Sequence, residues 1–353
     1  MKRIVQPLLA VLLGLSLGLA AAWLAGENPW QVLKILAQGA FGSRENLGMT
    51  LFYATPLVFT GLSVAVAFQA GLFNVGAEGQ LTLGALAAAT IGALWPRLWG
   101  PAAPLVAGMA AVGAGMVWGA IPGWLRARRG SHEVINTIML NFIAAGISTY
   151  VALYLLKNPE TQNPETRPVG PEYLIHHFAF FGSAPVSAAL PLALLTAAMV
   201  WVFLSRTALG YELRAVGQSE SAARAAGIDA GRIRILALTL AGGLAGMVGI
   251  GEVLGNAGRF KVEFSPQYGF IGIAVALLGR NEPLGVLAAA LFFGALHQGA
   301  SELDLNTEHL TRETALLFQG LIILTVSAEG IWRGMKRRES HSRTQRNGAA
   351  ATK

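Results

Sequence analysis

Residues 205–234, SRTALGYELRAVGQSESAARAAGIDAGRIR, form a long polar interruption in an otherwise apolar chain. The stretch contains five arginines, and hydrocarbon offers no partners for their charges, so it must lie in water on one side of a bilayer. Within it, residues 219–226 are predicted to form a short helix that Gly227 ends. A compact helix on such a loop is a docking surface for another protein.

The rest of the chain has the composition of a membrane protein. Of its 353 residues, 54% are hydrophobic and 13% are charged, whereas roughly a quarter of a soluble domain is charged. The net charge of +7 does not indicate nucleic acid, because the basic residues lie at the ends of apolar segments. The absence of cysteine excludes disulfides, thiolate metal sites and a cysteine nucleophile.

Ten apolar segments predict an all-α polytopic membrane protein with about ten transmembrane helices. The first segment, residues 8–25, is expected to be a retained span; the alternative is a signal peptide cleaved near Ala20 or Ala22. The other segments are residues 51–70, 81–96, 101–124, 134–156, 186–204, 235–254, 268–278, 284–300 and 315–331.

The distribution of basic residues predicts that both termini are cytosolic. With this orientation, 18 of the 26 lysines and arginines lie on the cytosolic side. Residues 205–234 are then cytosolic, while residues 157–183, which contain four prolines, lie outside and cap the outer mouth. Residues 1–338 are predicted to be the transmembrane domain and residues 339–353 a disordered cytosolic tail.

Glycines recur at four-residue spacing within several apolar segments, a pattern that allows two helices to approach closely. The alternative is chance, since the chain has 43 glycines. The pairs are Gly115 and Gly119, Gly242 and Gly246, and Gly251 and Gly255.

A polar stretch, GLFNVGAEGQ, lies between two apolar runs at residues 71–80. As a helix it would place Asn74 and Glu78 on one face, with Gln80 nearby; as a loop its glycines would allow an irregular backbone. Either form is costly in lipid unless it faces a water-filled path or another helix. We therefore predict that Asn74, Glu78 and Gln80 line a translocation path. The alternative is a short cytosolic turn with Glu78 in water.

A second polar stretch, SHEVINTIMLN, opens the fifth apolar segment. Ser131 is predicted to cap that helix, with His132 and Glu133 at the surface of its first turn. Asn136 and Asn141 are predicted to make helix contacts or to line the path.

Patterns that suggest an enzyme fail on their context. His132 and Glu133 lack the second histidine that a zinc site on a helix requires. The GLSLG match to a nucleophile elbow, at residues 14–18, has no strand before it. Glu252 ends the seventh apolar segment and is predicted to be solvated. No catalytic or metal site is predicted, and without a GxxxxGK[ST] loop ATP hydrolysis is expected on a partner chain.

Three motifs together resemble one family. FNVGAEGQ (residues 73–80), EVINTIMLN (133–141) and GIAVALLGRNEP (272–283) are similar to segments of the membrane-spanning permease subunits of bacterial ABC importers, most closely those of the nucleoside and simple-sugar branch. This class serves branched-chain amino acids, simple sugars and nucleosides, and the resemblance covers about residues 51–331. It implies a type II ABC importer fold in the bacterial cytoplasmic membrane. Nucleosides are the first substrate expectation, ribose-like sugars the second and branched-chain amino acids the third.

The opening stretch resembles the loop with which such permeases contact their ATPases. SAARAAG, residues 221–227, is similar to the EAA-xxx-G pattern, and residues 210–217 are similar to its flanking pattern. Serine replaces the leading glutamate, although Glu220 is adjacent. The coupling residues implied by the resemblance are Glu212, Arg214, Gly217, Ser221, Ala222, Ala223 and Gly227.

The resemblance also implies the partners. They are a second permease, identical or homologous, a cytosolic ATPase with two nucleotide sites, and an extracytoplasmic substrate-binding lipoprotein. ATP and magnesium are expected on the ATPase, so no cofactor is predicted on this chain. The rival functions are a secondary transporter, for which Glu78 is the main candidate relay, and an intramembrane enzyme, for which no constellation is found.

Overall fold

The computed structural model describes residues 2–307, 309–311 and 316–325, and the regular elements within these residues are helices. The predicted tail and the ends of the tenth apolar segment lie outside these residues. The described residues divide into two units, one formed by those within 1–36 and 300–325 and the other by residues 37–299.

In the first unit, α1 (Lys2–Leu24) packs against a helix over Leu316–Thr325. A Cβ atom on Gly18 would overlap the ring of Phe318, and the Thr325 hydroxyl donates to the carbonyl of Ala10 at 2.9 Å. The helix expected over the first apolar segment is thus present, and its retention in the mature chain stays a prediction.

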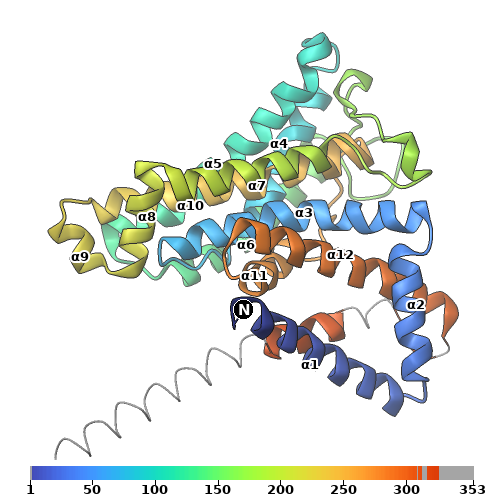
Figure 1. The fold of residues 1–353 in the computed structure, drawn as a ribbon. Helices are drawn as coiled ribbons and strands as arrows, with labels where there is room; N and C mark the ends of the chain where they lie inside the picture. Colours follow the sequence, from blue (N-terminus) through green and yellow to red (C-terminus); the bar gives the residue numbers. More distant parts are fainter. Residues whose placement is uncertain (1, 308, 312–315, 326–353) are drawn as a thin grey trace, which may run out of the picture. The chain divides into compact units, whose positions relative to one another are not determined.

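The second unit contains most of the remaining helices (Figure 1). Each of the ten predicted apolar segments holds a helix among the described residues, whereas α2 and α8 were not anticipated. Six described helical stretches are long and apolar enough to cross a membrane. The number of spans and the side of the termini stay predictions. The helices are α2 (Pro29–Phe41), α3 (Arg44–Gln69), α4 (Ala77–Leu94), α5 (Ala103–Arg129), α6 (Glu133–Tyr150), α7 (Ala189–Arg206), α8 (Ala208–Gln218), α9 (Glu220–Ala225), α10 (Ala230–Gly246), α11 (Tyr268–Leu278) and α12 (Pro283–Asn306).

The predicted close approach of glycine-spaced helices is found between α5 and α10. A Cβ atom on Gly115 would overlap the carbonyl oxygen of Gly242, and one on Gly242 would overlap that of Gly115. Gly119 and Gly246 meet carbonyls of the facing helix in the same way. The two backbones therefore touch, which dispersion and weak polar contacts favour in a membrane. Gly255 packs instead against Ser187.

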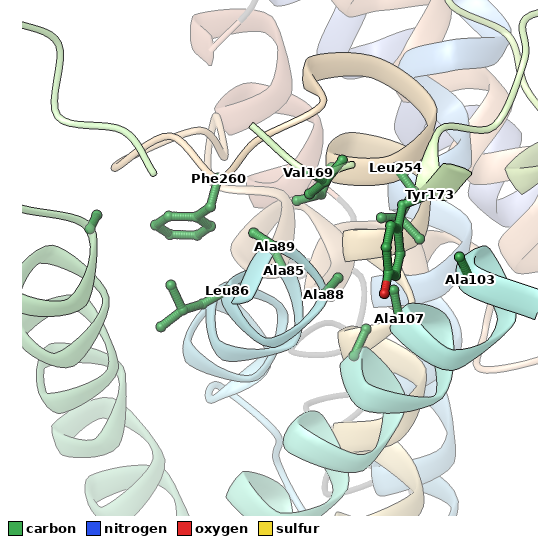
Figure 2. Close-up of a cluster of buried hydrophobic side chains, with 13 residues drawn as sticks. Ala85, Leu86, Ala88, Ala89, Ala103, Ala107, Val169, Tyr173, Leu254 and Phe260 are labelled. Atoms are coloured by element: carbon green, nitrogen blue, oxygen red, sulfur yellow. The ribbon is translucent and has the colours of Figure 1, made fainter. Parts of the chain in front are cut away.

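Residues 157–188 form an irregular segment at the end of α7 opposite to α8 and α9 (Figure 1). Figure 2 shows Val169 and Tyr173 of this segment among small side chains of α4 and α5, with Leu254 and Phe260 beside them. The Tyr173 hydroxyl donates to the carbonyl of Trp95 at 2.8 Å. The segment is thereby anchored over one end of the bundle, where the prediction placed an outer cap.

A buried ion pair also holds this segment. Arg259 lies 2.8 Å from the carboxylate of Glu165, which is 3% exposed. Burial raises the pKa of Glu165, but the hydrogen bonds from Arg259, Asn158 and Thr161 and the charge of Arg259 together lower it by more. The pKa of Glu165 is therefore below its usual value. Glu165 therefore stays charged, which keeps the pair intact at neutral pH.

Candidate translocation path and coupling segment

The chain between α3 and α4 is a buried loop. Leu72, Asn74 and Val75 are buried, and the Asn74 amide donates to the hydroxyl of Ser63 at 3.1 Å. Ser63 lies six residues before the end of α3, about 9 Å along the helix. Residues 70–76 thus turn back into the bundle before α4 begins. Of the polar stretch 71–80, residues 71–76 take the loop form and residues 77–80 form the first turn of α4, and the short turn in water is wrong.

Asn74 and Gln80 form a closed amide pair. The Asn74 amide donates to the Gln80 side-chain oxygen at 2.8 Å, and the Gln80 amide donates back at 3.1 Å. Both side chains are at most 1% exposed. The pair fastens the loop to the first turns of α4, and neither residue borders the polar cavity described below.

We expect Gln80→Leu to destabilise the protein by about 1–3 kcal/mol, because it leaves the Asn74 amide buried without its main partner. The double variant Asn74→Leu/Gln80→Leu removes both amides and should lose less than the sum of the two single variants. Thermal unfolding in detergent measures both effects. Additive losses would show that the two amides act independently.

Glu78 joins the N-terminal ends of two helices. Its carboxylate accepts a hydrogen bond from the backbone N–H of Gly269 at 2.7 Å and another from the Ser265 side chain. Gly269 belongs to the first turn of α11, whose N–H groups lack partners within the helix. Both α4 and α11 therefore begin inside the bundle and point their positive ends at one carboxylate.

A polar cavity of about 160 Å³ lies beside this junction, between α4, α6 and residues 262–265. Glu78, Asn141, Ser148 and Ser265 are among its lining residues.

Asn141 also holds the loop before α4. Its amide donates to the Val75 carbonyl at 3.0 Å, and its oxygen accepts from the Gly79 N–H at 2.9 Å. The structure thus brings Glu78 and Asn141 together. Asn136 lies apart, at the start of α6.

Two expectations for the start of α6 are wrong. The N-cap residue is His132, whose side chain makes no capping hydrogen bond to the helix. The Ser131 hydroxyl, which was expected to cap the helix, instead accepts a hydrogen bond from the Asn136 side-chain amide at 2.6 Å. Glu133 is 8% exposed and lies 3.3 Å from Arg126, so it is not a surface residue. The last turn of α5 supplies this arginine, which a pattern within one helix cannot reveal.

Glu252 is likewise buried, at 8% exposure, and the expectation of a solvated helix end is wrong. It lies in a π-helical turn, Ile250–Ala257, and hydrogen-bonds with the side chains of Tyr268 and Asn256. Tyr268 directly precedes Gly269, so a second carboxylate converges on the start of α11. The sequence did contain one sign of this arrangement. The eighth apolar segment, which became α11, is too short to cross a membrane, so its start had to lie inside the bundle.

The predicted short helix in the polar stretch is confirmed as α9. The hydroxyl of Ser219 caps it by accepting from the N–H of Ala222 at 3.4 Å. Gly227 ends it with a φ of +82°, and the N–H of Ile228 reaches the carbonyl of Ala223 at 3.0 Å. This is the hydrogen-bond pattern of a Schellman ending.

The coupling residues named by resemblance have different surroundings. Ser221, Ala222 and Gly227 are exposed, whereas Ala223 faces inward and is 3% exposed. Arg214 donates to the Leu204 carbonyl near the end of α7, which ties it to its own chain.

The end of α8 touches the start of the buried loop, because the backbones of Gly217 and Gly71 are in contact. A Cβ atom on Gly71 would lie 3.2 Å from the Cα atom of Gly217. Glu212, on the same helix as Gly217, is half-buried.

The acidic residue of α9 is Glu220, its first residue. Its carboxylate lies 2.5 Å from Arg234 of α10 and 2.7 Å from Arg224 of α9. The hydrogen bond from Arg234, followed by its charge and by Arg224, holds the pKa of Glu220 below its usual value. Glu220 therefore bonds inward and joins α9 to α10. The sequence placed Glu220 next to the predicted docking motif but could not show that Arg234 of α10 is its partner.

The family described as branched-chain amino acid transport system / permease component matches residues 46–327. The chain belongs to this family. It is therefore an ABC transporter permease and a multi-pass membrane protein.

Curated relatives of this permease transport several solutes. The chain is 34% identical to the guanosine ABC transporter permease NupP of Bacillus subtilis over 93% of its length and 94% of the relative. It is 35% identical to the nucleoside permease NupB of Lactococcus lactis over 85% and 84%. It is 33% identical to the glucose permease TsgB13 of Haloferax volcanii over 84% and 80%. The first two organisms also hold a second relative each, NupQ and NupC, which implies paired permease subunits.

Proposed function

We propose that this permease imports nucleosides along a path that passes the cavity beside Glu78 and Asn141. The observation that carries the proposal is the meeting of two helix N-terminal ends at Glu78, next to that cavity, in an otherwise apolar bundle. Transport sites are typically built from such broken helices, whose ends offer unpaired backbone groups to a solute.

The cavity suits a polyhydroxylated solute. Glu78 and Asn141 provide oxygen acceptors, and Ser148, Thr149 and Ser265 provide hydroxyl groups that both donate and accept. A ribose and a hexose both match this chemistry. The guanosine and nucleoside permeases among the relatives support nucleosides as the substrate, and the glucose permease supports simple sugars as the alternative.

The proposed assembly contains a second permease, a cytosolic ATPase with two nucleotide sites and an extracytoplasmic binding lipoprotein, in a bacterial cytoplasmic membrane. ATP and magnesium belong to the ATPase. The ATPase docks on α8 and α9, and the binding lipoprotein docks over residues 157–183, at the other end of the bundle. Asn74, Gln80 and Asn136 support the path by fastening its surroundings.

Two contacts connect the docking segment to the path. When α9 moves, the ion pair between Glu220 and Arg234 transmits the movement to α10. When α8 moves, the backbone contact between Gly217 and Gly71 transmits the movement to the loop that leads to Glu78. Closure of the ATPase on ATP thus shifts the element that shapes the cavity between two arrangements.

The rival function of a secondary transporter is set aside, because the chain belongs to the ABC permease family. The carboxyls of Glu78 and Glu252 both lie close to the start of α11, but each has its own hydrogen-bond partners there. Ion-driven uptake would need no ATPase, so the energy source of uptake tests the proposal directly.

The test is uptake of radiolabelled guanosine by cells that express the four proposed components and lack other nucleoside transporters. We expect uptake that stops on ATP depletion with the ion gradient clamped and persists when an ionophore abolishes the gradient. An ATPase partner unable to hydrolyse ATP is the control. Uptake of glucose but not guanosine would assign the sugar alternative, and uptake that follows the ion gradient would contradict ATP-driven import.

A further inference from the structure

Two cavities open along one face of α10, between α5 and the α7–α8 segment. The first, of about 660 Å³, is lined by Arg128 at the end of α5, by Arg232 and Ile235 at the start of α10, and by Leu209 of α8. The second, of about 480 Å³, has an almost wholly apolar lining that includes Met116, Phe203 and Leu240. We propose that the two form one groove that binds an anionic phospholipid.

The two cavities adjoin each other along α10, since Thr239 lines the first and Leu240 the second. Leu236 lines the first and Leu240 the second, one helical turn apart on the same face. From Arg232 to Met247 the groove follows the helix for about 22 Å. At its far end the Thr196 hydroxyl of α7 lies 3.9 Å from the sulfur of Met247, the residue after α10, and both residues line the second cavity.

The wide end of the groove has the charge that a phosphate group requires. Arg128 and Arg232 are exposed, and within the described part of the chain neither guanidinium has an ion-pair partner. The acidic residue at this end, Asp229, caps α10 by accepting from the N–H groups of Gly231 and Arg232. Its charge is thus directed at its own helix, and two arginines remain for an anion.

The position of the groove distinguishes a lipid from other anions. Arg128 lies at the end of the candidate span 100–129 and Arg232 at the start of the candidate span 230–257, so both mark the boundary of the bilayer. The apolar part then lies at hydrocarbon depth, where one leaflet is about 15 Å thick. A nucleotide or an ATPase loop would fill the basic end and leave the apolar end empty, whereas a phospholipid fills both.

The groove adjoins the coupling segment. Arg232 lies two residues before Arg234, which holds Glu220 and α9. A lipid phosphate on Arg232 therefore braces the helix that receives the movement of α9. Coupling then depends on anionic lipid as well as on the ATPase.

The experiment measures binding of spin-labelled phosphatidylglycerol and phosphatidylcholine to the purified full chain, alone and with its partner subunits. The test variant is Arg128→Gln/Arg232→Gln. The matched control is Arg129→Gln/Arg206→Gln, which removes two exposed arginines outside the groove lining. Leu240→Trp, on the half-buried apolar wall, blocks the acyl-chain part.

We expect about tenfold preference for phosphatidylglycerol in the parent and the control. That preference should disappear in Arg128→Gln/Arg232→Gln, and Leu240→Trp should reduce binding of both lipids. Arg128→Lys/Arg232→Lys keeps both charges and should retain most of the preference. If it does, the loss in Arg128→Gln/Arg232→Gln is due to the missing charges and not to a folding defect. Equal loss in the control would reduce the effect to general surface charge and overturn the proposal. Unchanged binding in Leu240→Trp, or displacement of the lipid by the ATPase, would overturn it as well.

Discussion

Gly115→Ala is expected to lower the thermal stability of the permease strongly, because the added Cβ atom would overlap the carbonyl oxygen of Gly242. Overpacking of a core costs about 1–3 kcal/mol when side chains can adjust. Here the opposing atoms are backbone, and Gly242 in turn fits against Gly115 and Gly119. The two helices must separate as a whole, which loosens the close α5–α10 interface. We therefore expect the upper end of this range or more.

A matched control lies two residues away on the same helix. A Cβ atom on Gly113 would meet nothing within 4 Å, so Gly113→Ala should be neutral or stabilise the helix by about 0.5–1 kcal/mol. Thermal unfolding of the purified chain in detergent gives the two midpoints. Equal shifts of the unfolding midpoint in both variants would contradict the proposed effect of the backbone contact, because only the change in helix propensity is common to the two substitutions.

The glycine contacts illustrate what the sequence could predict. Spacing of four residues indicated that Gly115 and Gly119, and Gly242 and Gly246, lie on helix faces suited to close packing. Spacing within one helix does not identify the facing helix, and Gly255 has the same spacing yet packs on Ser187. The positions of the spanning helices followed from hydropathy, whereas α8 was missed because it is short and amphipathic, with charged residues and glycines between Leu209, Leu213 and Val216.

The candidate path shows a similar division. Polar residues between apolar runs pointed to Glu78 and Asn141, and the structure places both at one cavity. Hydropathy does not report depth, so it could not show that residues 70–76 turn back into the bundle. It also could not show that Glu133 and Glu252 are buried, because their partners Arg126 and Tyr268 come from other helices.

In the proposed assembly, Arg234→Gln is expected to reduce solute uptake by about tenfold or more while the proposed ATPase stays bound. The substitution removes the charged partner that holds the Glu220 carboxylate at 2.5 Å, and hydrogen bonds to charged groups contribute about 1.5–3 kcal/mol each. Arg234 is largely covered, with a side chain that is 17% exposed, so water replaces it poorly. Without this bond α9 can move on the ATPase without moving α10. ATP hydrolysis should then continue without transport.

Arg224→Gln is the matched control, since Arg224 bonds the same carboxylate at 2.7 Å but has a side chain that is 64% exposed. An exposed pair within one helix contributes about 0.3–0.5 kcal/mol, so uptake should change less than twofold. Arg234→Lys keeps one charged bond and should restore part of the uptake. Uptake, ATP hydrolysis and ATPase co-purification are measured together for all three variants. Equal losses for Arg224→Gln and Arg234→Gln would assign coupling to the charge of α9 itself. Loss of the bound ATPase in Arg234→Gln would make this arginine part of the docking surface instead of the connection to α10.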